Sequence, residues 1–168
     1  VLGFAGALLH VVNHALFKGL LFLGAGAVVE ATGTREMDHL GGLLKRMPAT
    51  GAFFLVGALA IAGLPPLNGF ASEFLVFLGA YRSALHPAGA VAGPAFAVLA
   101  GLALIGGLAA ACFAKVFGVV FLGEPRSGHV ARARDPGAAM RLPMLLLAAA
   151  CVVLGLAPAL LVGRLGGA

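Results

Sequence analysis

The chain has 168 residues, of which 61% are hydrophobic and 10% charged, and its formal net charge is +5. Soluble domains carry roughly 45–50% apolar and about 25% charged residues, so these few polar groups exclude a water-covered globular domain. The basic residues lie between apolar runs rather than along one stripe, which also excludes a nucleic-acid-binding surface.

Four apolar segments are long enough to cross a membrane, which takes about 20 helical residues. They cover residues 3–31, 49–85, 92–122 and 142–165. The sequence predicts an all-α, polytopic membrane protein with four transmembrane helices, the second of them broken. Because Val1 already lies in an apolar run, without a basic leader, we interpret the chain as a fragment of a longer protein.

Three ionisable residues lie in the middle of the first segment. His10, His14 and Lys18 are spaced at i, i+4 and i+8, so a helix places them on one face, in steps of about 6 Å. An ionisable group at the bilayer centre costs about 3 kcal/mol or more. We interpret the row as a water-bridged proton relay; a single such histidine is otherwise a hydrogen-bonded core residue. Glu30, at the end of this segment, is either a proton entry point or a solvated charge.

The first connection, residues 32–48, contains apolar residues at helical spacing. These are Met37, Leu40, Leu43 and Leu44. The spacing predicts a short amphipathic helix lying at the membrane interface.

The second segment is too long for one straight crossing and too short for two crossings joined by a turn. Its middle, residues 63–69, reads GLPPLNG, and prolines remove backbone donors and clash with the preceding helical turn. We predict a broken helix at membrane depth, which is tolerated where the backbone is buried or lines a hydrated cavity and marks ion sites in transporters. A plain proline kink, or a turn between two short helices, is the alternative.

Glu73 follows this break, in the motif GFASEFLVF. A buried carboxylate and a buried amine that come close have coupled protonation. Glu73 and Lys18 are therefore predicted to form a pair that loads and releases a proton. The alternative is a fixed structural ion pair.

The third and fourth segments carry fewer signals. Lys115 lies about two turns from the end of the third segment, where it is either a tentative further proton-transfer residue or a lysine whose amine reaches the interface. Cys112 and Cys151 lie far from any partner motif and are predicted to be small buried residues.

Basic residues are concentrated in the connections 32–48 and 123–141, which four crossings place on one side. They are Arg35, Lys45, Arg46, Arg126, Arg132, Arg134 and Arg141, against Arg82 and Arg164 elsewhere. By the positive-inside rule both connections are predicted to be cytoplasmic, in a multi-pass protein of the inner (cytoplasmic) membrane.

No motif for a cofactor or a metal is visible. The chain lacks a phosphate-binding glycine loop, a CxxC pair and a nucleophile elbow, and His39, His86 and His129 are isolated in connections. We therefore predict no cofactor and no metal in this chain, so that any redox step belongs to another subunit.

Three motifs occur in an order typical of one known family. HVVNHALFKGLLFLGAGAV, GTREMDHLGGLLKRMP and LAIAGLPPLNGFASEFLVF resemble the antiporter-like membrane subunits of respiratory complex I, multisubunit cation/proton antiporters and membrane-bound [NiFe] hydrogenases. ATGTREMDHLGGLLKRMP, GLPPLNGF and FAKVFGVVFLGEPRS are most similar to the large subunit of hydrogenase-4 and formate hydrogenlyase.

The resemblance implies a bundle of two inverted repeats, of which this chain holds the C-terminal part. His10, His14 and Lys18 match the family's H-x3-H-x3-K helix, and Glu73 matches the charged residue at its broken helix. The charged residues of the first repeat are not in this chain, which implies that it does not pump alone.

We interpret the chain as a proton-translocating, non-redox membrane subunit of an oxidoreductase complex. The implied partners are other membrane subunits and peripheral redox subunits of a hydrogenase or complex I-like assembly, and the lipid bilayer, with no nucleic acid. One alternative is a cation/proton antiporter subunit without a redox partner. Another is a structural anchor whose buried charges only fix the helix register.

Overall fold

The computed structural model describes residues 2–85 and 91–157, and this part of the chain is helical, without strands. Its α-helices are α1 (Leu2–Thr32), α2 (Pro48–Ile61), α3 (Asn68–Ala84), α4 (Ala92–Phe121), α5 (Gly128–Ala131) and α6 (Ala138–Leu156). Residues 86–90, with His86, and residues 158–165 of the expected fourth segment, with Arg164, lie outside the described residues.

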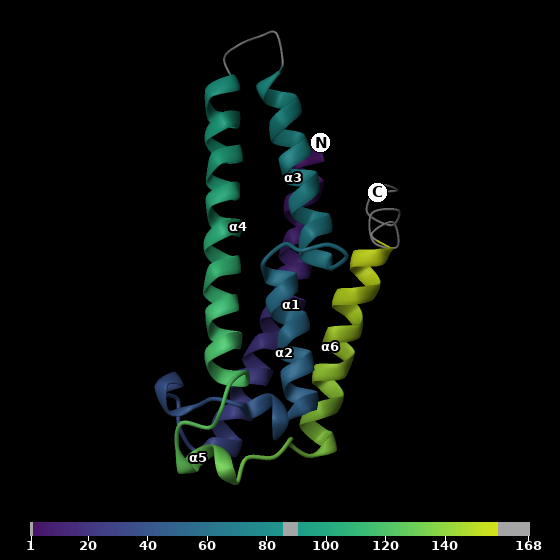
Figure 1. Ribbon diagram of the computed structural model, residues 1–168. Helices are drawn as coiled ribbons and strands as arrows, with labels where there is room; N and C mark the ends of the chain where they lie inside the picture. The colour runs from purple at the N-terminus through teal and green to yellow at the C-terminus, as the bar shows by residue number, and fades with distance from the viewer. Residues whose placement is uncertain (1, 86–90, 158–168) are drawn as a thin grey trace.

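The helices form an elongated bundle in which α1 runs beside α2 and α3, while α4 and α6 flank them on opposite sides (Figure 1). Within the described residues, α1, α4 and α6 are long and apolar enough to cross a membrane, and α2 is a shorter apolar helix. The all-helical membrane architecture is therefore confirmed.

The outer surface of the bundle is apolar, and its core lies toward one end. Core side chains with no exposed surface come from α1, α2, both connections and α6; they are Leu20, Leu43, Met47, Ala60, Val130, Met144 and Cys151. Large apolar side chains such as Phe4, Phe22 and Leu104 are exposed, as expected for a surface that faces lipid.

Helix α4 lies at the edge of the bundle, and only its two ends contain buried residues. Cys112, in its middle, is exposed, whereas Cys151 of α6 is buried. The prediction that both cysteines are buried was therefore wrong for Cys112, because apolar composition alone does not distinguish a lipid-facing position from a core position.

The first connection does not form the predicted amphipathic helix. It contains two short 3-10 turns, η1 (Met37–His39) and η2 (Leu43–Lys45). Between them, Gly41 and Gly42 have φ angles of +143° and +66°, which a continuous right-handed helix cannot contain. Leu40 and Leu43 are buried in the core rather than resting on a membrane surface.

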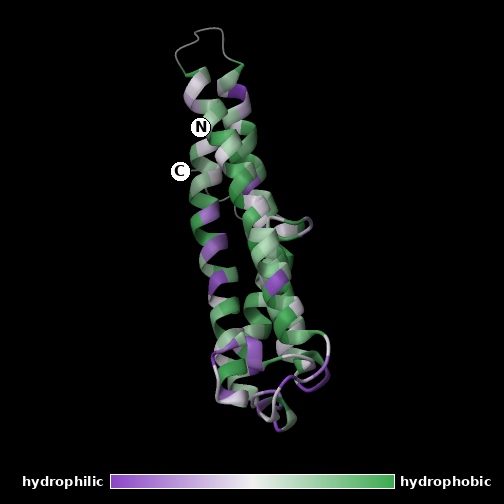
Figure 2. Cartoon of the chain, turned by 60° about the vertical axis from the view of Figure 1, so that its left-hand side comes forward, coloured by the Kyte–Doolittle hydropathy of each residue, from purple (hydrophilic) through white to green (hydrophobic). Residues whose placement is uncertain are grey.

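The two polar connections lie at the same end of the bundle and contact each other. The amide of Gly42 donates to the carbonyl of Leu122 at 2.8 Å, and Lys45 Nζ lies 2.6 Å from Glu124 Oε1. Figure 2 shows that hydrophilic residues gather at this end and are otherwise isolated bands on apolar helices.

A carboxylate from the second polar connection caps the start of α2. Asp135 accepts hydrogen bonds from the amides of Ala49 and Thr50, at 3.0 and 2.9 Å, and from the Thr50 hydroxyl at 2.7 Å. Free amides and the helix dipole favour an anion at a helix N-terminus. This contact joins the start of α2 to the second polar connection.

We expect Asp135→Ala to destabilise the full-length protein by about 2 kcal/mol, because it removes an N-cap that serves three donors. The measurement is thermal unfolding in detergent. Asp38→Ala, which removes an exposed acid at the same end, is the matched control and should change the midpoint little. Equal midpoints for the two variants would contradict the capping role.

Candidate functional site

The candidate site is built around a gap between two helices. Helix α2 ends at Ile61 and α3 begins at Asn68. Gly63 has a φ angle of +65°, which only glycine adopts readily, and the two prolines cannot donate backbone hydrogen bonds. In Figure 1 the non-helical segment lies between α2 and α3 at mid-height of the bundle.

Close backbone contacts hold this segment from two sides. A Cβ atom added at Gly69, in α3, would meet the carbonyl oxygen of Ala60, near the end of α2. A Cβ atom added at Gly155 of α6 would meet the carbonyl oxygen of Pro66. Small residues allow such close approach, so α2, α3 and α6 are packed tightly around the break.

Two buried asparagines join the start of α3 to the middle of α1. Asn13 Nδ2 donates to the carbonyl of Asn68 at 2.8 Å, and Asn68 Nδ2 donates to Asn13 Oδ1 at 3.1 Å. The side chains are 1% and 0% exposed. Asn68 Oδ1 has no partner in the described residues, which leaves one acceptor that a water molecule can fill.

A second polar contact lies one helical turn away. His10 Nδ1 is 3.1 Å from the hydroxyl oxygen of Ser72, which is fully buried. His10 precedes Asn13 by three residues and Ser72 follows Asn68 by four, so both contacts lie on the same faces of α1 and α3. The His-bearing helix is thus hydrogen-bonded directly to the helix that follows the break.

The predicted row on α1 forms a partly open surface. The ring centroids of His10 and His14 are 6.0 Å apart, and the ring of Phe17 packs edge-on against both. His10 and Lys18 are half-buried and His14 is exposed. Lys18 Nζ lies 5.9 Å from the centre of the Phe22 ring.

Lys18 also lines a groove between helices. This groove, of about 180 Å³, is bounded by Phe54 of α2 and Phe113 of α4. The lysine amine therefore lies beside apolar and aromatic side chains rather than beside a carboxylate, which leaves it without a fixed counterion in the described part of the chain.

Glu73 is half-buried on α3, and its carboxylate folds back against Gly63 in the segment after α2. In the described residues the ion pairs are Glu36–His39 and Lys45–Glu124, both at the polar end. Lys18 and Glu73 thus do not form the close pair that the sequence suggested. Glu73 lies at the break. Lys18 lies further along α1 than His10, directly after Phe17.

The two remaining residues for which the sequence suggested a role in proton transfer lie apart from the polar contacts between α1 and α3. Lys115 is exposed on α4, and Glu30 is exposed near the end of α1. No group of three His, Cys, Asp or Glu side chains that could hold a metal occurs among the described residues.

Asn13, Asn68 and Ser72 are site residues that sequence reasoning missed. Each is polar in a segment read as apolar, and Asn13 lies inside the very motif that carries the histidines. A search for all polar groups on the His10 face, rather than for titratable groups alone, would have found Asn13. The pairing with α3 is a long-range contact that spacing along one helix does not encode.

Comparisons with known proteins confirm the resemblance. A family model described as NADH:quinone oxidoreductase/Mrp antiporter, TM, matches residues 1–100. Hydrogenase-4 component B of Escherichia coli (strain K12) is 49% identical over 158 residues, covering 93% of this chain and 23% of that protein. Formate hydrogenlyase subunit 3 of the same strain is 44% identical over 171 residues, covering 99% and 28%.

A solved structure shares the fold as well as the sequence. One chain of respiratory complex I from Thermus thermophilus with bound NADH has a TM-score of 0.73 and 35% identity, over 92% of this chain and 30% of that chain. The present chain spans about a quarter of the length of the two curated relatives. Because the family model covers more than half of its residues, the chain belongs to the NADH:quinone oxidoreductase/Mrp antiporter transmembrane family.

Proposed function

We propose that the chain is part of a subunit that translocates protons across the cytoplasmic membrane within a redox-driven complex of the hydrogenase-4 or formate hydrogenlyase type. Two relatives with 49% and 44% identity carry those names, which supports this branch of the family. The observation that carries the proposal is the buried polar contact at the helix break, where His10 meets Ser72 and Asn13 meets Asn68.

Helices α2 and α3 together form one broken crossing in this proposal. They contain 14 and 17 residues, about 21 and 26 Å of helix, and neither alone spans a hydrocarbon core of about 30 Å. Placed one after the other beside the 31 residues of α1, they match its length. The protein then has four crossings, with the break near the middle of the membrane, where non-helical backbone indicates a functional site.

Protons move in this proposal along α1 and across to the break. His10, His14 and Lys18 lie about 12, 18 and 24 Å from the start of α1, well inside the membrane. The hydrogen bond between His10 and Ser72 positions this row against α3, and Glu73 is the acid beside the break. Lys18 supplies a base without a fixed counterion, and Lys115 a further base on α4.

The polar end of the bundle faces the cytoplasm in this proposal. Both basic connections lie there and contact each other, which is the arrangement that the positive-inside rule predicts for cytoplasmic loops. Other membrane subunits and peripheral redox subunits supply the energy, since redox motifs are not visible in the sequence. The chain covers only part of its relatives, so the complete path includes residues beyond it.

The proposal is tested with Lys18→Met in the full-length subunit, assembled in its complex and reconstituted in proteoliposomes. We expect proton translocation driven by the electron donor to fall at least about tenfold, because methionine keeps the length of the side chain but carries no proton. Lys45→Met, at an exposed loop lysine, is the matched control and should translocate normally.

Three results would contradict the proposal. Normal proton translocation by the Lys18→Met complex would remove Lys18 from the path. Sodium-dependent proton flux without any electron donor would instead favour a cation/proton antiporter, and loss of assembly in place of loss of turnover would favour a structural anchor.

A further inference from the structure

The hydroxyl of Ser72 has three polar neighbours, and only one of them can donate a proton. The carbonyl oxygens of Gly69 and Asn68 lie 3.0 and 3.3 Å from Ser72 Oγ, and His10 Nδ1 lies 3.1 Å away. Carbonyl oxygens only accept hydrogen bonds, whereas a serine hydroxyl has one proton and two lone pairs. Directing the proton to Gly69 leaves the lone pairs of Ser72 facing His10.

The nitrogen of His10 that faces these lone pairs must then carry a proton. This is the case both for the neutral ring with Nδ1 protonated and for the doubly protonated cation. In both states Nδ1 keeps its proton, and Nε2 is the nitrogen that gains or loses one.

Ser72 does not pass this proton onward. Its other two neighbours are backbone carbonyl oxygens, which cannot take up a proton and release it to a further group under these conditions. The hydrogen-bonded chain from His10 therefore ends on α3, and the hydroxyl orients the ring instead of conducting through it.

The position of the hydroxyl is fixed by the asparagine pair one turn away. The side-chain amides of Asn13 and Asn68 are fully buried, and each donates a hydrogen bond to the other residue. The start of α3 therefore cannot slide along α1 without breaking two buried hydrogen bonds.

We propose that Ser72 is a positioning residue that holds His10 in the form protonated at Nδ1, so that His10 exchanges protons through Nε2 alone. The consequence for transport rests on the proposed function of the chain. The assignment of the ring nitrogen does not, because it rests on the hydrogen bonds that the Ser72 hydroxyl donates within α3.

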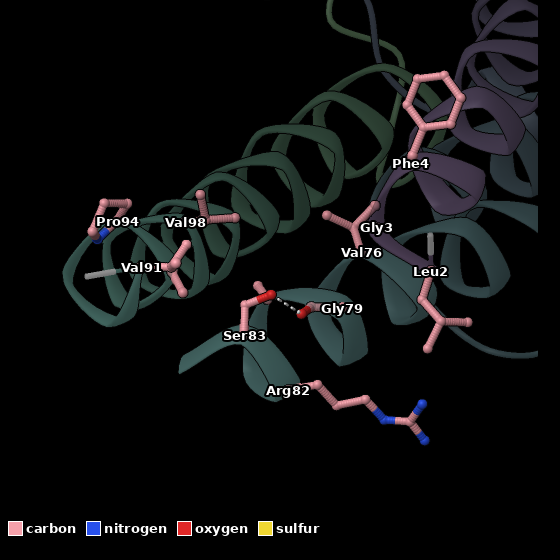
Figure 3. Close-up of a pocket in the computed structure, with 12 residues that line it drawn as sticks. Leu2, Gly3, Phe4, Val76, Gly79, Arg82, Ser83, Val91, Pro94 and Val98 are labelled. Carbon is pink, nitrogen blue, oxygen red and sulfur yellow. Dashed lines mark hydrogen bonds between the residues drawn. The ribbon is translucent and has the colours of Figure 1, made fainter. Parts of the chain in front are cut away.

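The chain offers a matched control on the same helix. Ser83 of α3 also donates to the carbonyl four residues earlier, Gly79 O, at 3.0 Å, but it is exposed and far from the histidines. Figure 3 shows this Ser83–Gly79 hydrogen bond at the other end of α3. Ser83→Ala and Ser72→Ala therefore each remove a hydrogen bond from a serine hydroxyl to a carbonyl of the preceding helical turn, and only Ser72→Ala also removes the contact with His10.

The first measurement is nitrogen NMR of the full-length complex with ¹⁵N-labelled histidine, in which the His10 signal is identified by its loss in His10→Gln. We expect the neutral ring to be protonated at Nδ1 in the wild type, in Ser83→Ala and in Ser72→Thr, which keeps the hydroxyl. In Ser72→Ala the signal should shift toward the form protonated at Nε2. An unchanged His10 signal in Ser72→Ala would overturn the proposal.

The second measurement is proton translocation by the same complexes in proteoliposomes. We expect Ser72→Ala to lower the rate about tenfold, since a misoriented relay group loses its reactive geometry, and Ser72→Thr to restore most of it. A tautomer change with normal translocation would support the role of Ser72 while removing His10 from the proton path. The NMR signal of His10 thus tests the role of Ser72, and the translocation rate tests whether His10 belongs to the proton path.

Discussion

Replacing Glu73 by glutamine should abolish proton translocation, with a loss of at least about a hundredfold, while the complex still assembles. Glutamine has the size and the hydrogen-bonding capacity of glutamate but cannot take up or release a proton at this position. Glu73 is the acid of the described residues that lies beside the break, with its carboxylate against Gly63. The measurement is proton uptake by proteoliposomes that contain the full-length complex and its electron donor.

Two further variants separate protonation from position. Glu73→Asp keeps the acid but shortens the side chain, so that it no longer reaches Gly63, and we expect an intermediate rate. Glu36→Gln removes an exposed acid at the polar end and should leave translocation unchanged. If Glu73→Gln translocated at the wild-type rate, the acid would have no part in the path. If Glu73→Gln failed to assemble while Glu73→Asp assembled, the charge would be structural.

The helical architecture of the chain could be predicted from local features of its sequence. Long apolar runs were sufficient to predict an all-helical membrane protein, and the GLPPLNG motif lies where α2 ends at Ile61 and α3 begins at Asn68. Local chemistry determines both features, because twenty apolar residues can satisfy their backbone groups in lipid only as a helix and consecutive prolines cannot continue one. The predicted interfacial helix failed for a local reason too, since the spacing of Met37, Leu40 and Leu43 was weighed without Gly41 and Gly42.

The site was predicted less completely than the helices. The row of His10, His14 and Lys18 is a property of one helix, and the structure places the two histidine rings 6.0 Å apart. The partners of that row depend on how α3 returns along α1, and the expected Lys18–Glu73 pair is not formed. Instead, α3 contacts α1 through uncharged side chains, with Asn68 bonded to Asn13 and Ser72 bonded to His10.

Hydrogen bonds between uncharged groups are suited to a helix contact beside a proton path. A fixed ion pair between Lys18 and Glu73 would hold both groups in their charged forms, since each charge favours the other. Amide and hydroxyl groups hold α1 and α3 together without imposing a charge on any titratable residue. The acid and the base then remain available for proton exchange, and the geometry of the break is set independently of their protonation.

Gly69→Ala should destabilise the fold, although alanine is normally the better residue within a helix, by about 1 kcal/mol. A Cβ atom at this position would meet the carbonyl oxygen of Ala60 and would lie 3.7 Å from the ring of Phe17. The backbone of α2 cannot yield as a flexible side chain would, so α3 must move away from α2. We expect a loss of about 1–3 kcal/mol in stability, which is the usual cost of overpacking.

Gly19→Ala is the matched control, because a Cβ atom there would lie 3.5 Å from a side-chain methyl group of Leu147, an ordinary contact. Thermal unfolding of the full-length protein in detergent should therefore show a lower midpoint for Gly69→Ala and an equal or higher one for Gly19→Ala. Hydrogen exchange should increase at the start of α3 in Gly69→Ala, because the Asn13–Asn68 hydrogen bonds depend on the same close approach. Stabilisation by both substitutions would mean that α2 and α3 are not packed end to end, and the break would then lack the rigid frame that orients Ser72 toward His10.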